Sequence, residues 1–115
     1  MKYLVLLAHD PGMWAEADPA TFAAYHQAHV DFARVVGEHI LSGEALAGTD
    51  TATTLRRKDG RETLTDGPFA EGAEMVGGYY LLDAPDLDTV LGWCRLLPEP
   101  YSIEIRPCVR VEGLT

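Results

Sequence analysis

An α+β fold, with one antiparallel sheet and two helices on one of its faces, is predicted for this chain of 115 residues. The expected order of elements is strand, helix, strand, hairpin, strand, helix, strand. Both helical stretches are amphipathic, and each begins after an aspartate suited to cap a helix. A chain of this length forms a single domain, over residues 1–115.

The first strand is expected over residues 3–8, which are apolar on both faces. This pattern is typical of a central strand that is covered on two sides. A helix follows from Ala20 to about Glu38, with Asp18 as its N-cap and Pro19 in its first position. One face of this helix is almost wholly apolar and is therefore expected to pack on the sheet: Phe22, Tyr25, His29, Phe32, Ala33 and Val36.

A short strand is expected over residues 40–46, and a β-hairpin follows it. The hairpin strands cover residues 51–58 and 61–65, and Asp59 and Gly60 form the two-residue turn between them. Both faces of this hairpin are polar. We therefore expect it at a rim of the fold.

The remaining elements lie in the second half of the chain. A strand is expected over residues 75–83, where Gly77 and Gly78 indicate a bulge or a close backbone approach. Asp86 caps a short helix, and residues 102–111 alternate between apolar and polar side chains as a final strand. This order is the split βαβ plan of ferredoxin-like domains, which leaves one sheet face bare. A second copy of the chain is the expected cover.

Composition excludes several classes of function. The net charge is −9, from 18 acidic and 9 basic residues, so nucleic acids and anionic membrane surfaces are repelled. No apolar run approaches the ~18 residues of a membrane span, and no signal peptide precedes the first strand. Cys94 and Cys108 lack the spacing of a metal or redox site, which predicts free, largely buried thiols. A cytoplasmic protein is expected.

No pattern typical of a cofactor site occurs in the chain. A Gly-rich phosphate loop, a G-x-S-x-G motif and a nicotinamide fingerprint are all missing. His26 and His29 have the i,i+3 spacing of two ligands on one helix face, but the local pattern does not complete a metal site. We therefore expect neither a cofactor nor a metal.

His29 and Asp66 are the candidate catalytic residues. His29 lies at the centre of the apolar helix face, and a neutral imidazole beside a cleft can act as general acid or base. Asp66 could bond that imidazole and fix its tautomer. Two structural alternatives stay open: a buried histidine with one polar partner, and an aspartate that caps its own turn. His9 closes the first strand, where pockets often open, but turn formation is enough to account for it. Trp14 could cover a cavity, and ordinary packing accounts for it equally well.

Four further residues are predicted to bind a substrate. Arg56 of the hairpin can hold a carboxylate through two hydrogen bonds, and Glu74 can polarise a ligand. Phe32 and Tyr79 are expected to line a cavity beside His29. Simpler alternatives also stay open: a rim ion pair for Arg56, a solvated loop charge for Glu74, and core or interface packing for the aromatic residues.

The most distinctive segment of the chain is an acidic loop that leads into a glycine-opened aromatic strand. Asp66-Gly67-Pro68-Phe69, followed by Ala70-Glu71 and by Gly77-Gly78-Tyr79, resembles the YCII-related family, and specifically its DGPF-domain branch. The similarity runs nearly end to end and includes further segments: Trp14 and residues 1–4, 28–33, 43–46, 51–54, 93 and 103–107.

The resemblance implies a dimeric α+β barrel, a cavity between the sheet and the helices, and a catalytic role for His29. The family loop usually continues with threonine and lysine where Gly72 and Ala73 stand here, so a lysine for anion binding is missing. Some relatives are small-ring lyases or dehydrochlorinases, and others accompany extracytoplasmic-function sigma factors.

Two functions therefore stay open. One is a cofactor-independent lyase, isomerase or dehydrochlorinase that acts on a small anionic or carbonyl-bearing molecule by proton transfer through histidine. The other is a non-catalytic protein that binds a small ligand or regulates a protein partner, such as a sigma factor.

Overall fold

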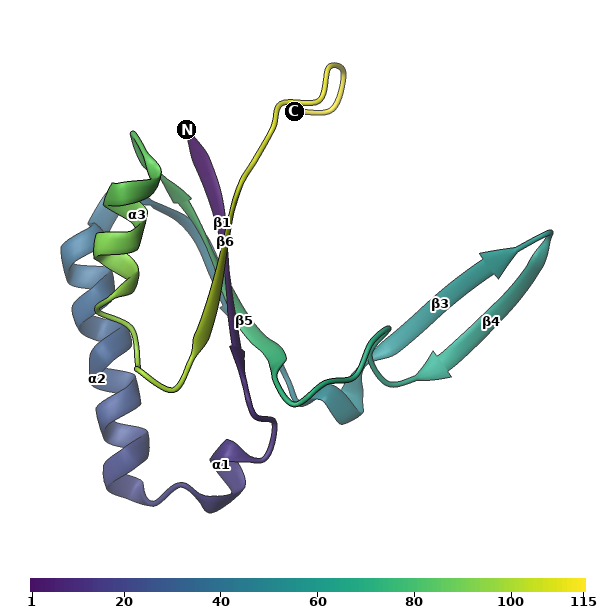
Figure 1. The fold of residues 1–115 in the computed structure, drawn as a ribbon, viewed down its shortest axis with the longest axis horizontal. Coiled ribbons are helices and arrows are strands. Elements are labelled where there is room, and N and C mark those ends of the chain that lie inside the picture. The colour runs from purple at the N-terminus through teal and green to yellow at the C-terminus, as the bar shows by residue number, and fades with distance from the viewer.

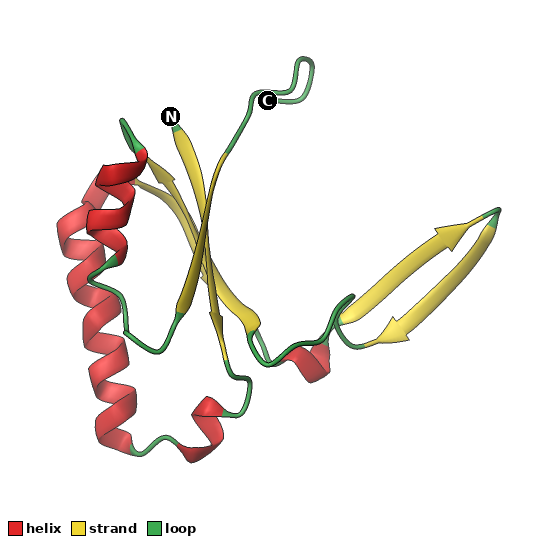
Figure 2. Cartoon of the chain, viewed as in Figure 1, coloured by secondary structure: helices red, strands yellow, loops and turns green.

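A computed structural model describes the whole chain, residues 1–115. Its main sheet is antiparallel and has the strand order β2-β5-β1-β6. Two helices, α2 (Pro19–Val36) and α3 (Leu87–Cys94), lie on one face of this sheet (Figure 1). Figure 2 shows the same separation of helices and strands. The strands are β1 (Lys2–His9), β2 (Ile40–Ala45), β5 (Met75–Asp83) and β6 (Ser102–Pro107). The predicted α+β fold is confirmed.

Both helices that lie on the sheet begin where the sequence predicts. The Asp18 carboxylate accepts a hydrogen bond of 2.8 Å from the backbone N–H of Thr21, and Asp86 accepts one of 2.8 Å from Thr89. The bond from Thr21 lowers the pKa of Asp18, and the pKa of Asp86 is lowered first by a hydrogen bond from the Thr89 hydroxyl and then by that from its backbone N–H, because such bonds stabilise the ionised carboxylate. Three short helical turns are additional to the prediction: α1 (Met13–Glu16), η1 (Gly37–His39) and η2 (Thr49–Thr51). No helix combines the length and apolar character needed to cross a membrane.

The hydrophobic core lies between the sheet and the two helices. Alternate residues of β1, namely Tyr3, Val5 and Leu7, point to the helices and are buried. The remaining members of the core come from α2, β5, α3 and their flanks: Phe32, Val36, Leu82, Ala84, Val90, Cys94 and Leu97. The intervening residues of β1 lie on the opposite, uncovered face, where Leu4 pairs with Leu81 and Leu6 with Tyr79.

Strand β6 is shorter than the predicted strand over residues 102–111. It ends at Pro107, which pairs with Tyr3, and the backbone N–H of Cys108 then donates to the carbonyl of Lys2. Because β1 begins at Lys2, no partner strand is left for the residues that follow. Cys94 is buried, and burial raises its pKa to about 11, whereas Cys108 is exposed, contrary to the expectation of buried thiols.

A separate two-stranded sheet leaves the body of the protein. Strands β3 (Thr53–Lys58) and β4 (Arg61–Asp66) pair only with each other and project away from the main sheet (Figure 1). The predicted turn is confirmed, with φ angles of 52° at Asp59 and 76° at Gly60. We call residues 53–66 the arm. Its apolar residues Leu55 and Leu64 are 54% and 65% exposed, so the arm has no core of its own.

Candidate functional site

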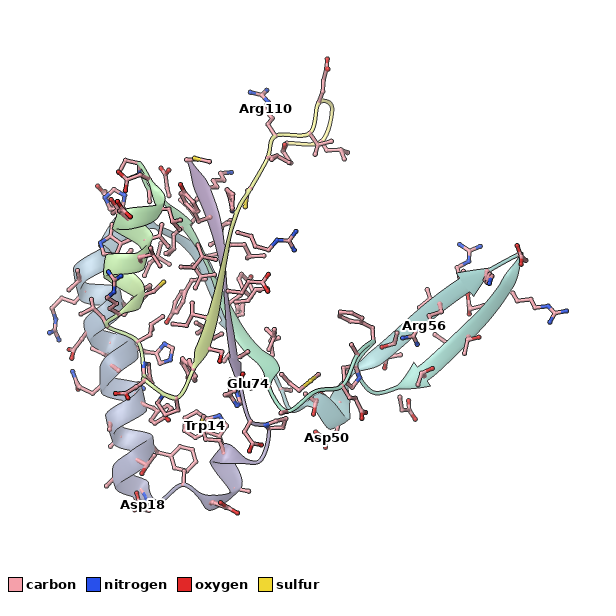
Figure 3. All side chains as sticks on the ribbon, viewed as in Figure 1. Trp14, Asp18, Asp50, Arg56, Glu74 and Arg110 are labelled. Atoms are coloured by element: carbon pink, nitrogen blue, oxygen red, sulfur yellow. The ribbon has the colours of Figure 1, made fainter.

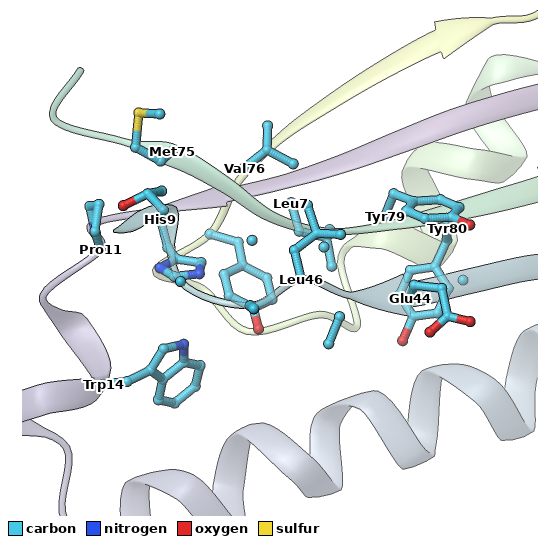
Figure 4. A pocket seen from close by; sticks show the side chains of 18 of the residues that line it. Leu7, His9, Pro11, Trp14, Glu44, Leu46, Met75, Val76, Tyr79 and Tyr80 are labelled. Atoms are coloured by element: carbon cyan, nitrogen blue, oxygen red, sulfur yellow. The ribbon is translucent and has the colours of Figure 1, made fainter. Parts of the chain in front are cut away.

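A pocket of about 650 Å³ opens at the end of the sheet where β1 and β2 end and β5 begins (Figure 4). Four aromatic rings line it: Trp14, Tyr79, Tyr80 and Tyr101. The two histidines in its wall come from different elements, His9 from the end of β1 and His29 from α2. The pocket therefore combines apolar aromatic surface with two imidazoles, which is the usual composition of a small-molecule site.

His29 is held between two tyrosine hydroxyls. Its Nδ1 lies 2.7 Å from the hydroxyl of Tyr80, and its Nε2 lies 3.1 Å from the hydroxyl of Tyr101. A neutral imidazole has one N–H donor and one acceptor nitrogen. One tyrosine therefore accepts a hydrogen bond from His29 while the other donates to it. The ring of Tyr80 is fixed in turn by Phe32, with ring centroids 4.7 Å apart.

Burial keeps this cluster uncharged near neutral pH. The pKa of His29 is lowered, mainly by loss of solvent around the ring and further by the nearby charge of His26. Burial also raises the pKa of Tyr80 and of Tyr101. Each shift favours the neutral form of its group, and a relay in which every member gives up one proton and takes another leaves no member charged.

His9 is the second imidazole of the pocket. Its Nδ1 lies 2.9 Å from the backbone carbonyl of Asp10. Because a carbonyl oxygen only accepts, this Nδ1 must carry the proton, and Nε2 is left as an acceptor. The rings of Trp14 and Tyr101 flank His9, with centroids 6.0 Å and 5.9 Å away. The sequence left open whether His9 faces a pocket or only forms a turn.

A glycine opposite His9 makes room for its ring. Gly77 is the unpaired residue of a bulge in β5, since Leu7 pairs with Gly78 and Ala8 with Val76. A Cβ at position 77 would collide with Nε2 of His9. The predicted bulge is therefore confirmed, and its close approach is to a pocket side chain. A histidine at a strand end, together with paired glycines, is the sequence signal that would have indicated this contact.

Aromatic side chains extend the wall of the pocket beyond the sheet. Trp14 stacks on Phe22, with ring centroids 5.0 Å apart, and meets Tyr25 edge-on at 4.7 Å. Phe22 is 46% exposed and Ala33 is also exposed, so the prediction that both pack on the sheet is wrong. Phe22 lies one turn into α2, beside α1, and finds Trp14 as its partner there.

Asp66 does not contact His29 within this chain, because both nitrogens of the imidazole are bonded to tyrosines. It ends β4 on the arm, pairs with Thr53 and is exposed. The loop after it is tied to the arm by Gly67, whose N–H donates to Ala52 and whose carbonyl accepts from the Thr54 hydroxyl. A catalytic role for Asp66 stays a prediction.

The four predicted substrate-binding residues are dispersed. Tyr79 lines the pocket, whereas Phe32 is fully buried in the core. Arg56 lies on the arm (Figure 3), where its Nη2 donates to the carbonyl of Phe69 at 2.7 Å. Glu74 accepts a short hydrogen bond from the hydroxyl of Ser102. Within one chain, therefore, only Tyr79 joins His29 in the pocket, and binding by the others stays a prediction.

Comparison with known proteins assigns a family. A YCII-related domain matches residues 1–111. The chain belongs to the YCII-related family. It is also 42% identical over 66 residues to the uncharacterized protein R00369 of Rhizobium meliloti (strain 1021), a match that covers 54% of this chain. The match spans about half of that relative, 53% of its length. The predicted YCII-related family is confirmed.

Proposed function

We propose that this protein is a small cofactor-independent enzyme of the lyase, isomerase or dehydrochlorinase type. Its substrate is a small carbonyl-bearing or anionic molecule, and the reaction is a proton transfer. The observation that carries this proposal is the bridge that His29 forms between two tyrosine hydroxyls in the pocket wall. Four polar atoms in a row are arranged as a path for protons.

The bridge can supply an acid and a base at once. A substrate C–H bond next to a carbonyl breaks, and its proton passes to the oxygen of one tyrosine. That tyrosine gives its own proton to the acceptor nitrogen of His29, and the other ring nitrogen gives its proton to the second tyrosine. The second tyrosine then protonates the carbonyl oxygen, which completes an enol. Because Tyr80 and Tyr101 both line the pocket, both ends of this path face the ligand.

We assign the protein to the DGPF-domain branch and infer that two copies form a dimeric α+β barrel through their uncovered sheet faces. Apolar residues at the centre of that face support the pairing: Leu4, Leu6, Tyr79 and Leu81. Sedimentation at micromolar concentration should give about twice the 12.6 kDa of the chain. A monomer would contradict this part of the proposal. In such a dimer, Arg56 and Asp66 of the arm could reach a pocket that they do not reach alone.

Deuterium exchange tests the reaction without knowledge of the product. A panel of small ketones, lactones and oxo acids is incubated with the protein in D₂O, and the loss of α-proton signals is followed by NMR. We expect exchange of at least one compound, with His29→Gln slower by about 10²–10⁴-fold. Tyr80→Phe and Tyr101→Phe should each slow it too, because either change cuts the path.

The matched control is His26→Gln, which changes an exposed histidine one turn away on the same helix. Its exchange rate should equal that of the unaltered protein. If no compound exchanges faster with the unaltered protein than with folded His29→Gln, the enzymatic proposal is wrong.

The alternative function is a non-catalytic ligand-binding or regulatory protein in the cytoplasm, beside a partner such as an extracytoplasmic-function sigma factor. One observation favours it: both nitrogens of His29 already have partners, as in a histidine whose role is structural. Ligand binding that survives His29→Gln, with no exchange by either protein, would support this alternative.

A further inference from the structure

Strand β2 carries a glycine directly opposite Tyr80. Gly43 pairs with Tyr80 across the ladder between β2 and β5, and Val5 pairs with Tyr80 on the β1 side. The φ of Gly43 lies outside the left-handed region, so any residue can adopt its backbone conformation. Glycine inside a strand also weakens the strand, because it has no side chain to pack. The backbone of β2 therefore does not require glycine at this position.

The ring of Tyr80 occupies the space in which a side chain at position 43 would lie. A Cβ on Gly43 would be 2.7 Å from Cδ1 and 3.1 Å from Cε1 of Tyr80. Carbon atoms that are not bonded to each other stay about 3.5–4.0 Å apart. The ring of Tyr80 would therefore have to move if residue 43 carried any side chain.

Such a move would disturb the contact between Tyr80 and His29. The ring of Tyr80 packs against Phe32, with ring centroids 4.7 Å apart, and Phe32 is fully buried, so the ring has little freedom. The hydroxyl of Tyr80 lies 2.7 Å from Nδ1 of His29. Because the hydroxyl is at the far end of the ring, a tilt about Cβ moves it further than it moves Cδ1. A hydrogen bond weakens as its length and angle depart from their best values.

We propose that Gly43 is a positioning residue of the pocket: it leaves its side-chain space to the ring of Tyr80 and so holds the Tyr80 hydroxyl at hydrogen-bonding distance from His29. Where it concerns the reaction, the inference rests on the proposed function, because Tyr80 is one end of the proton path through His29. Gly43 acts through Tyr80 and gives or takes no proton itself. Residues 43–46 form one of the segments that resemble the YCII-related family, and this segment thereby gains a role in the site.

Imidazole NMR tests the positioning without any substrate. In the resting protein, the nitrogen resonance of His29 Nδ1 reports whether this atom shares a hydrogen bond with Tyr80. We expect Gly43→Ala to shift this resonance in the same direction as Tyr80→Phe does, because both changes remove the bond. Gly92→Ala is the matched control, since its added Cβ meets nothing within 4 Å, and it should leave the resonance unchanged.

Deuterium exchange tests what the positioning does for the reaction. In the D₂O experiment, Gly43→Ala should slow the exchange of α-protons by about 10–10²-fold, because it misplaces a group of the proton path. In a protein that already carries Tyr80→Phe, Gly43→Ala should cause no further loss, since no hydroxyl is left to misplace. Gly92→Ala should exchange at the rate of the unaltered protein.

A further pair of variants identifies the group that excludes a side chain at position 43, even if Gly43→Ala alone does not fold. Tyr80→Val keeps a side chain suited to a strand and has no atom at the δ position. The double variant Gly43→Ala/Tyr80→Val should therefore unfold at no lower urea concentration than Tyr80→Val does. A lower midpoint would show that the Tyr79 carbonyl, 3.1 Å from the added Cβ, excludes the side chain in place of the ring, and the inference would be wrong.

The inference is also wrong if folded Gly43→Ala leaves the Nδ1 resonance of His29 unchanged, or if its effect on exchange adds to that of Tyr80→Phe. Either result leaves the enzymatic proposal standing, since exchange by the unaltered protein is its test. If no compound exchanges even with the unaltered protein, the enzymatic proposal fails instead, and the resonance of His29 still decides the role of Gly43.

Discussion

The pocket and the arm differ in how the chain supports them. In the pocket, His29, Tyr80 and Tyr101 bond to one another across the fold, and Tyr80 rests on the buried ring of Phe32. In the arm, every residue except Thr54 is exposed, and β3 and β4 have no third strand. An isolated two-stranded hairpin is marginally stable in water. The pocket is therefore held by contacts across the fold, whereas the strands of the arm are held by their pairing with each other.

Charge separates the same two regions. The arm carries Arg56, Arg57, Lys58 and Arg61, four of the nine basic residues of the chain. The pocket carries Glu44 and Asp50 and no lysine or arginine. The distinctive segment is thus divided between the two regions. Gly67 and Phe69 of its acidic loop bond to the arm and its base, whereas Gly77, Gly78 and Tyr79 line the pocket.

The largest expected difference between body and arm is in stability. Phe32→Ala should lower the free energy of unfolding by about 3–5 kcal/mol, because it removes a fully buried ring. Leu64→Ala on the arm should lower it by less than about 0.5 kcal/mol, since that side chain is 65% exposed. Urea unfolding followed by circular dichroism measures both. Equal losses would mean that the arm is as well packed as the body.

A smaller effect is expected when the hydroxyl of Tyr80 is removed. Tyr80→Phe should cost about 1–2 kcal/mol of unfolding free energy, because a nitrogen of the half-buried His29 loses its partner. Tyr79→Phe is the matched control, since Tyr79 precedes Tyr80 in the chain and the hydroxyl of Tyr79 makes no hydrogen bond within the chain. If the two variants unfold at the same urea concentration, the contact between Tyr80 and His29 contributes nothing.

The dependence of stability on pH should be weaker still and should come from the pocket. The pKa of His29 is lowered from 6.5 by burial, so the unfolded chain binds a proton more readily than the folded one. The part of the unfolding free energy that depends on neutral His29 is then fully present above pH 6.5, and it is lost as the pH drops below this value. His29→Gln should remove this part of the slope between pH 7.5 and 5.5 in urea titrations, and His26→Gln should retain most of it, because burial is the larger cause of the shift. An unchanged slope in His29→Gln would contradict the burial of this group.

The smallest effect on global stability is expected at the tip of the arm. Gly60→Ala strains a residue with φ of 76°, so it should open the turn and speed amide hydrogen exchange in β3 and β4. The unfolding midpoint of the body should not change. Gly92→Ala in α3 is the opposite case: its added Cβ meets nothing within 4 Å and should stabilise the helix by about 0.5–1 kcal/mol. Slower exchange in the arm of Gly60→Ala would show that the turn is not strained there.

Local patterns were enough to predict most elements and several of their details. The caps at Asp18 and Asp86, the turn at Asp59 and Gly60 and the bulge at Gly77 all follow from preferences of a few adjacent residues. The end of the last strand was missed because it depends on where β1 begins, far away in the chain. The alternation of apolar and polar residues in the last strand carries no information about where its partner strand β1 begins.

The site could be predicted only in part. The helical period brought His29 to the face that packs on the sheet, but its partners are 51 and 72 residues away in the chain, and no local preference selects Tyr80 and Tyr101 over Asp66. The direction of the arm and the meeting of His9 with Gly77 are likewise outcomes of packing between distant segments. Backbone preferences act over a few adjacent residues and can be predicted from the sequence, whereas the partners of a side chain are determined only when distant segments pack together.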